Sequence, residues 1–355
     1  MVRATWPMRI AVVGALTGAV FSCDPDEDAG GRADAGPPNL AVSILALGHS
    51  SACVLRQDGD MYCWGSVDEV PGASVSQSSP VKIAALSGAG VRGVGLGDGS
   101  GCTVHADGTA RCWGYNGWGQ LGDGSTTDHR EPELVASLTD AVAIETSGLH
   151  ACARVKSNDL KCWGRNSQRQ VVDDTARMHS VPVDSRQRDV RAFGVADGYS
   201  CAVSAGGRPT CWGDPEAGAL RTGTLDDVVR ISLGQRTACA VRSDGNVHCW
   251  GSNFDGVVAP EGVGRAQTPE RVRGLTDVVD VRLASSSACA LHRNGTVSCW
   301  GSPMGTLLES WSLALPPTLV PDIDSAVSLA LGFAHACVVT RDDRILCWGP
   351  TRPAS

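Results

Sequence analysis

Residues 102–114 read CTVHADGTARCWG, and the chain of 355 residues repeats this pattern seven times. Each copy has two cysteines separated by ten residues, and the second cysteine is followed by Trp-Gly. The first cysteines of successive copies lie 38 to 50 residues apart. This is the period of a four-stranded propeller blade rather than of a solenoid coil. The seven pairs are Cys53 and Cys63, Cys102 and Cys112, Cys152 and Cys162, Cys201 and Cys211, Cys239 and Cys249, Cys289 and Cys299, and Cys337 and Cys347.

The ten-residue separation predicts a β-hairpin with a three-residue loop. The sixth residue after each first cysteine is Gly, Asn or Asp, types that tolerate the positive φ such a loop requires. In this register Cys102 lies opposite Cys112 as a non-hydrogen-bonded pair, with Cα atoms about 4.5 Å apart. A disulfide can bridge that distance. On the opposite face Trp113 meets the small residue Gly101, so both faces of the hairpin are apolar, as expected for strands between adjacent blades.

The sequence therefore predicts an all-β fold, a seven-bladed β-propeller with one disulfide within the hairpin of each blade. The 43 glycines support this class because an all-β chain needs many tight turns. Paired cysteines can also bind zinc, but zinc needs about four donors, and no second pair or histidine stands at ligand spacing. We expect no metal and no cofactor. Seven disulfides require an oxidising compartment.

The first segment, residues 1–22, has the features of a signal peptide. Arg3 and Arg9 accompany an apolar run at 10–20 that is too short to span a bilayer. Val20-Phe21-Ser22-Cys23 resembles a bacterial lipobox, which predicts cleavage before Cys23 and a diacylglycerol on its sulfur. The alternative is an ordinary secretory peptide with an unrelated cysteine, and both interpretations export the protein.

Residues 23–38 are acidic and have no large apolar residue, so they predict a flexible tether before a propeller at 39–355. We expect lipid anchoring to the bacterial envelope, at the outer membrane or cell surface rather than the inner membrane. The alternative remains open, because Asp24 after the modified cysteine is an inner-membrane retention signal in enteric bacteria. The net charge is −8, and without segments 1–22 and 23–38 the propeller carries about −6. Such a charge disfavours phosphate backbones, so we expect no nucleic-acid partner.

Residues 113–124, WGYNGWGQLGDG, resemble the signature of the regulator of chromosome condensation repeat family. The core of the repeat recurs between about residues 41 and 349, whereas the loops diverge. The resemblance implies a seven-bladed ring closed by strands from both termini, so we expect residues 37–44 to pair near the last blade. The founding members of the family act on a small GTPase and on chromatin. An exported, acidic protein meets neither partner, so we do not transfer that role.

Catalytic motifs are weak in this sequence. Residues 48–52, Gly-His-Ser-Ser-Ala, are similar to a nucleophile elbow with alanine in the last place, but other copies have an ordinary loop such as Gly97-Asp98-Gly99 there. Neither a His-Glu-x-x-His motif nor a P-loop occurs. His150 and His335 share one repeat position, where other copies have Ser, Thr or Tyr, which favours hydrogen bonding in a turn. We expect no enzyme activity; a catalytic site assembled from several blades remains an alternative.

Aromatic residues outside the repeated core positions are the candidate binding residues, because aromatic side chains are enriched in binding hot spots. They are Tyr115, Trp118, Tyr199, Phe254 and Trp311. We predict a monomeric, non-enzymatic module that binds an unknown protein partner at the cell envelope and contacts the membrane only through its lipid. The alternative is an inhibitor of another exported protein, as in similar propellers that block β-lactamases.

Overall fold

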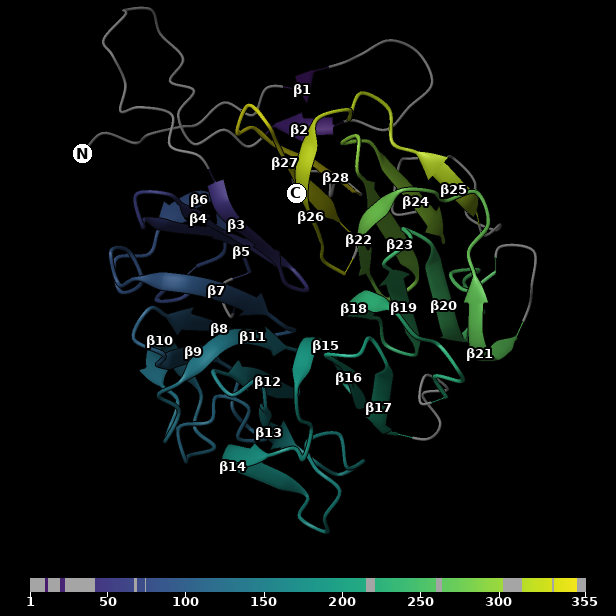
Figure 1. The fold of residues 1–355 in the computed structure, drawn as a ribbon. Coiled ribbons are helices and arrows are strands. Elements are labelled where there is room, and N and C mark those ends of the chain that lie inside the picture. Colours follow the sequence, from purple (N-terminus) through teal and green to yellow (C-terminus); the bar gives the residue numbers. More distant parts are fainter. Residues whose placement is uncertain are drawn as a thin grey trace, which may run out of the picture.

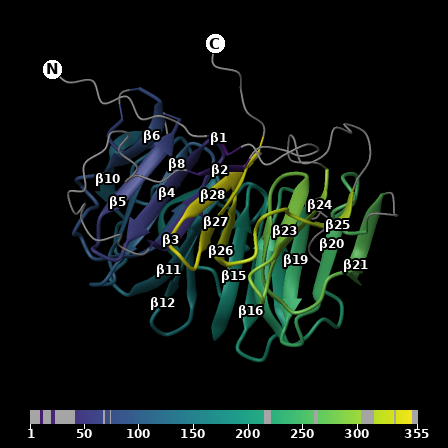
Figure 2. The same cartoon turned by 90° about the horizontal axis from the view of Figure 1, so that it is seen from above.

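The computed structural model describes residues 10–11, 20–22, 42–66, 69–73, 75–214, 221–259, 264–302, 315–333 and 335–349. These residues form seven antiparallel sheets that stand around a central axis as the blades of a propeller (Figure 1). Figure 2 shows strands of neighbouring blades running alongside one another. The predicted all-β, seven-bladed fold is confirmed. None of the described residues belongs to a helix of the length and apolarity that crossing a bilayer requires.

Each blade places its first strand along the axis and its later strands farther out (Figure 1). Blade 1 consists of β3 (Val42–Leu47), β4 (Ser51–Arg56), β5 (Met61–Gly65) and β6 (Gln77–Lys82). Blade 2 consists of β7 (Val91–Leu96), β8 (Ser100–His105), β9 (Ala110–Gly114) and β10 (His129–Leu134). Blade 3 consists of β11 (Ala141–Thr146), β12 (His150–Val155), β13 (Leu160–Arg165) and β14 (Met178–Asp184).

The later blades follow the same order. Blade 4 consists of β15 (Val190–Ala196), β16 (Tyr199–Ser204) and β17 (Pro209–Gly213). Blade 5 consists of β18 (Val228–Leu233), β19 (Thr237–Arg242), β20 (Val247–Ser252) and β21 (Arg265–Arg271). Blade 6 consists of β22 (Val278–Leu283), β23 (Ser287–His292), β24 (Val297–Gly301) and β25 (Leu315–Leu319). Blade 7 consists of β26 (Ala326–Leu331), β27 (Ala336–Thr340) and β28 (Ile345–Trp348), with β2 (Val20–Ser22) and β1 (Ile10–Ala11) outside them.

The predicted hairpin register is present in all seven blades. Each first cysteine lies directly opposite its second, and the seven disulfides join Cα atoms 4.0 to 4.1 Å apart. The turn position has the predicted positive φ, for example +87° at Gly59, +65° at Asn158 and +63° at Asp343. One disulfide within the hairpin of each blade is therefore confirmed.

Closure of the ring differs from the prediction. Strand β3 begins at Val42 and pairs with β4 inside blade 1, where Ile44 lies opposite Leu55. It meets blade 7 only through side-chain packing, and the strand next to β28 is β2 (Figure 1). The expectation that 37–44 pairs near the last blade is wrong for residues 42–44, because the inner strand of each copy pairs with the hairpin that follows it. Residues 37–41 lie outside the described part of the chain.

The hydrophobic core lies between the blades. Seven clusters of buried residues each fill one interface between adjacent blades. In the interface between blades 2 and 3, for example, Trp163 packs against Leu121 and Val135 and is fully buried. Because both faces of a blade are covered by its neighbours, the exposed surface consists of the outer strands and of the loops at the two ends of the ring.

Candidate functional site

Two kinds of loop gather at one end of the ring, which we call the loop face. They are the loops from the first to the second strand of each blade and the loops from the third to the fourth. Hydrogen bonds join the two kinds across adjacent blades: Gln120 Nε2 donates to the carbonyl of Gly148 at 3.0 Å, and Gln170 Nε2 donates to the carbonyl of Asp197 at 3.0 Å. The hairpin turns that join second and third strands, such as that containing Asp107, lie at the other end because paired strands are antiparallel.

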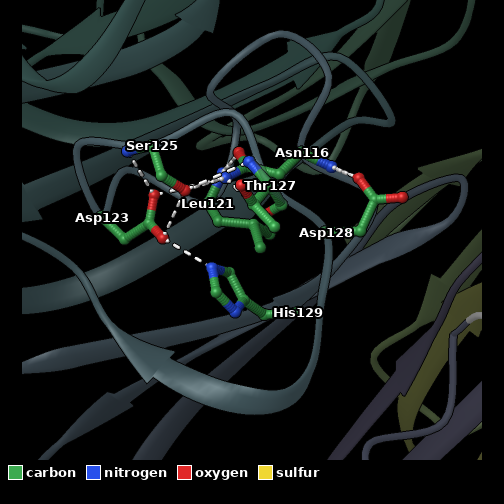
Figure 3. A network of polar contacts seen from close by, with 7 residues as sticks. All are labelled: Asn116, Leu121, Asp123, Ser125, Thr127, Asp128 and His129. Atoms are coloured by element: carbon green, nitrogen blue, oxygen red, sulfur yellow. Dashed lines mark hydrogen bonds and ion pairs between the residues drawn. The ribbon is translucent and has the colours of Figure 1, made fainter.

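One buried asparagine organises the loop between β9 and β10 (Figure 3). Asn116 Nδ2 donates to Asp123 Oδ1 at 3.2 Å, to Ser125 Oγ at 3.2 Å and to the carbonyl of Thr127 at 3.0 Å. Its Oδ1 accepts a hydrogen bond from Leu121 N at 3.0 Å. An amide group whose donors and acceptor are all used holds the loop in shape and has no capacity left for a ligand.

The same arrangement recurs in two other blades. Asn166 Oδ1 accepts from Val171 N at 3.0 Å while its Nδ2 donates to Asp174 Oδ1 at 2.8 Å. Asn253 Oδ1 accepts from Val258 N at 2.8 Å. The polar residues of the repeat signature thus have a structural role: they give the loop face a defined shape.

In blades 2, 3 and 6 the tryptophan after the second cysteine ties the loop of the preceding blade to its own blade, whereas the buried indole nitrogens of Trp212 and Trp348 have no hydrogen-bond partner among the described residues. In these three blades the indole N–H donates to a carbonyl in the third-to-fourth-strand loop of the preceding blade, at 2.9 Å from Trp113 to Glu69, 2.8 Å from Trp163 to Gln120 and 2.8 Å from Trp300 to Val257. The loop packs closely against the indole, because a Cβ on Gly122 would lie 2.7 Å from Trp163 Nε1. These contacts set the spacing of the loops around the axis.

The first-to-second-strand loops meet around the axis and form a concave opening, which we call the axial mouth. Equivalent positions of the seven loops line it with His49, Asp98, Gly148, Asp197, Gln235, Ser285 and Phe333. Neighbouring loops touch through their backbones, since a Cβ on Gly97 would lie only 1.7 Å from the carbonyl oxygen of Ser147. Close packing of this kind makes the mouth a preformed site.

Two carboxylates flank Gly148 in the mouth. Gly148 N donates to Asp197 Oδ1 at 3.3 Å, and a Cβ on Gly148 would lie 2.8 Å from Asp98 Cβ. Burial raises the pKa of Asp197, and the negative charge of Asp98 raises that pKa further. The side chain of Asp98 is 68% exposed. Because glycine has no side chain, the loop of blade 3 packs directly against Asp98, and both carboxylates line the mouth on either side of Gly148.

An aromatic pair continues the wall of the mouth beyond Asp98. His49 Nδ1 lies 3.8 Å from Asp98 Oδ2. The His49 ring stacks on Phe333, with ring centroids 4.2 Å apart and an interplanar angle of 23°. Phe333 is 43% exposed. The mouth therefore combines an exposed aromatic surface with an acidic pair.

A collar of mostly leucine side chains closes the bottom of the mouth and lines the channel beneath it; it consists of Leu47, Leu96, Thr146, Leu233, Leu283 and Leu331. Below the collar the channel contains Glu145 and Arg282, and Arg282 Nε donates to Asp280 Oδ2 at 3.0 Å. Burial raises the pKa of Glu145, while the positive charge of Arg282 opposes that rise. The floor of the mouth is thus apolar, and the charges of the channel lie beyond it.

Comparison with known families agrees with this architecture. A profile of the regulator of chromosome condensation (RCC1) repeat matches residues 107–154. A second profile of the same repeat matches residues 228–257 and 326–349. The chain carries RCC1 repeats. The resemblance inferred from residues 113–124 is therefore confirmed.

Among curated proteins, this RCC1-repeat chain is similar to the ultraviolet-B receptor UVR8 of Arabidopsis thaliana, with 29% identity over 196 residues. The match covers 53% of this chain and 44% of UVR8, so the chain spans less than half of that relative.

Solved structures share the fold of the RCC1 repeats. Prp20p of Saccharomyces cerevisiae has a TM-score of 0.72 and 17% identity, covering 88% of this chain and 83% of that one. Human WBSCR16 has a TM-score of 0.72 and 16% identity, covering 89% and 88%. The ectodomain of the Arabidopsis thaliana receptor kinase ACR4 has a TM-score of 0.53 and 18% identity, covering 89% and 100%. At these identities the likeness concerns the fold.

The aromatic residues predicted to bind a partner have different positions in the RCC1-repeat ring. Tyr115 and Phe254 belong to third-to-fourth-strand loops and are exposed, by 46% and 82%. Trp118 is half-buried, and the guanidinium carbon of Arg165 lies 5.1 Å from its ring centroid. Trp311 lies outside the described residues.

Tyr199 requires a correction. Its side chain is fully buried, and its hydroxyl donates towards the carbonyls of Gly234 at 2.9 Å and Thr237 at 2.8 Å in the next RCC1 repeat. Burial also raises the pKa of the phenol. Tyr199 therefore packs one blade against the next and presents no surface to a partner. Its position, equivalent to that of His150, indicated this role in turn hydrogen bonding.

The histidines and serines considered for catalysis have structural partners in the RCC1 repeats. His150 is fully buried with its Nε2 2.7 Å from Ser200 Oγ, and burial lowers its pKa to about 3. Ser51 Oγ donates to Glu69 Oε2 at 2.5 Å, and Ser50 N donates to the same oxygen at 3.1 Å. Burial raises the pKa of Glu69. Both residues of the Ser50-Ser51 motif thus contact a carboxylate.

The axial mouth was not predicted from the sequence. Asp98, Asp197 and Phe333 come from three blades, and their common signal is only that each lies four residues before the first cysteine of its copy. Across the described residues, no group of three or more His, Cys, Asp or Glu side chains is placed to hold a metal ion. The concave mouth of the RCC1-repeat ring is a candidate binding site because exposed aromatic and acidic side chains line it.

Proposed function

We propose that the protein is a non-enzymatic interaction module, tethered to the cell envelope, that binds a protein partner through its loop face. The observation that carries this proposal is the preformed axial mouth, in which half-buried His49 and exposed Phe333 lie beside Asp98 and Asp197. Preorganised loops lose little conformational entropy on binding, and aromatic anchors contribute much of the energy of protein interfaces.

The comparisons support a binding role because RCC1-like propellers include proteins that bind other proteins. The RCC1-like structure of Prp20p was described together with its binding to Gsp1p and histones. We infer a protein partner of another kind here, because this chain is acidic and carries a signal-like N-terminal segment. An inhibitor of another exported protein would use the same face, and the identity of the bound partner distinguishes the two interpretations.

Site-specific photo-crosslinking tests the loop face as the binding surface. A photoreactive residue at the position of Tyr115 or Phe254 is expected to join the protein to one envelope partner, because both side chains are exposed in loops of the loop face. Matched positions at Asp107 and Asn294, exposed in hairpin turns at the other end of the ring, are expected to give no such product. Crosslinks formed only from Asp107 and Asn294 would assign binding to the opposite face.

The envelope location rests on the seven disulfides and on the lipobox-like residues 20–23. Disulfides persist in oxidising compartments and are rare in the cytosol. Cleavage before Cys23 removes β1 and β2, so that β28 becomes the outer strand of blade 7 in the mature chain. The same cleavage leaves the Cys23 sulfur to carry the lipid.

A Cys23→Ser variant is expected to lose the lipid and to move from the membrane fraction to the soluble or unprocessed fraction. A single acyl chain already gives reversible membrane binding and two give stable anchoring, so the change in partitioning is large. Mass spectrometry of the mature N-terminus and detergent partitioning measure it. A Ser22→Ala variant is the control and keeps its lipid. Equal partitioning of the Cys23→Ser variant and the unmodified chain would rule out the anchor.

A further inference from the structure

We propose that the axial mouth is a receptor for an arginine side chain presented by the protein partner. This inference rests on the proposed function and adds the chemistry that the loop face recognises. The guanidinium would lie between Asp98 and Asp197 above Gly148, beside the stacked His49 and Phe333.

The charges around the mouth favour a cation. The lining contains the carboxylates of Asp98 and Asp197, and no lysine or arginine is among the described residues that line it. The two carboxylates come from blades 2 and 4, on either side of the glycine of blade 3. A guanidinium presents five N–H donors in one plane, so it can donate to carboxylates on two sides at once.

No described cation occupies the space between these carboxylates. Among the described residues, the cationic partner of Asp98 is His49, whose Nδ1 lies 3.8 Å from Asp98 Oδ2. Arg165 lowers the pKa of Asp197 through its positive charge, yet its guanidinium lies over Trp118 at 5.1 Å. Among the described residues no ion pair joins Arg165 to Asp197. The acidic pair is therefore open to a ligand from outside the chain.

The rest of the mouth fits the other parts of an arginine side chain. The exposed ring of Phe333 offers a π face, over which a guanidinium is attracted by about 0.5–1 kcal/mol at an exposed site. The leucine collar at the floor provides apolar surface for the methylene stem. A carboxylate pair, an aromatic wall and an apolar floor together match a long, planar, cationic side chain better than a metal ion or a compact ammonium group.

Titration with short peptides tests this assignment on the full chain. The probes are the blocked peptides acetyl-Gly-Gly-Arg-Gly-Gly-amide, its lysine analogue and its citrulline analogue, which has nearly the shape of arginine without the charge. Backbone amide shifts are followed by NMR at millimolar peptide. The arginine peptide is expected to shift Gly48, Gly97 and Gly148, and to bind about tenfold more tightly than the citrulline peptide, since one charge-assisted contact is worth roughly a factor of ten.

Variants of the mouth test the acidic pair and the aromatic wall separately. The double variant Asp98→Asn with Asp197→Asn keeps the size of both side chains and is expected to weaken the arginine peptide at least tenfold. Phe333→Leu keeps an apolar side chain without a π face and is expected to weaken it roughly two- to fivefold. Asp107→Asn, an exposed change at the other end of the ring, is the matched control and leaves affinity unchanged. Thermal unfolding checks that each variant is folded.

Three results would overturn the inference: equal affinity for the citrulline and arginine peptides, equal or tighter binding of the lysine peptide, or shifts away from the mouth. Photo-crosslinking separates this failure from failure of the proposed function. Crosslinks from Tyr115 and Phe254 that persist in the Asp98→Asn, Asp197→Asn variant would keep the loop face as the binding surface while excluding arginine recognition in the mouth.

Discussion

Refolding of the protein with its fourteen blade cysteines reduced is expected to yield no stable propeller at 37 °C. Each disulfide closes a ring of ten residues, worth at most roughly 2.5–3 kcal/mol by loop-closure entropy. Seven such contributions together match or exceed the total stability of a typical domain, which is about 5–15 kcal/mol. Only seventeen residues of 355 are aromatic, so the core offers limited compensation.

The measurement compares circular dichroism and urea unfolding after refolding from denaturant with and without reductant. The control is a variant that lacks one of the seven disulfides, Cys152→Ala with Cys162→Ala. It is expected to remain folded and to lose about 2–3 kcal/mol of unfolding free energy. Both cysteines are fully buried, so the smaller alanines also leave a cavity that adds to the loss. Equal stability of the reduced and oxidised chains would show that the blades do not depend on their disulfides.

Replacement of Trp163 by alanine is expected to lower the free energy of unfolding by about 3–5 kcal/mol. The side chain is fully buried between blades 2 and 3, and its indole donates to the carbonyl of Gln120 at 2.8 Å. The variant therefore loses packing and leaves that buried carbonyl without its donor. Urea unfolding gives the loss of stability, and hydrogen exchange in residues 115–128 is expected to rise because the loop loses its attachment.

Trp118→Ala is the matched control for Trp163→Ala. Trp118 belongs to the loop that Trp163 holds, but it is half-buried, and its described ring partner is the surface residue Arg165. Its loss is expected to cost less than about 1 kcal/mol, as for surface substitutions. Similar losses at the two positions would mean that the interfaces between blades do not depend on the tryptophan after the second cysteine.

The hairpins could be predicted from local sequence because the turn conformation and the strand register depend on residues within about ten positions of one another. Positive φ at the turn position favours Gly, Asn or Asp, as at Gly59 and Asn158, and the register that follows places Cys53 opposite Cys63. Tyr199 shows the limit of such reasoning. Its residue type indicated a binding aromatic, but the next blade supplies two carbonyls for its hydroxyl and covers its ring.

The disulfide pairing, the number of blades and the family follow from residues 53–349 read in order, since each depends on spacing along the chain. The strand beside β28 and the composition of the axial mouth depend on contacts between segments far apart in sequence. Asp98 and Asp197 are separated by about a hundred residues and flank one glycine only because blades 2, 3 and 4 follow one another around the axis. Spacing along a chain encodes the interior of each blade, whereas the chemistry of the mouth arises when seven unlike loops are packed into one ring.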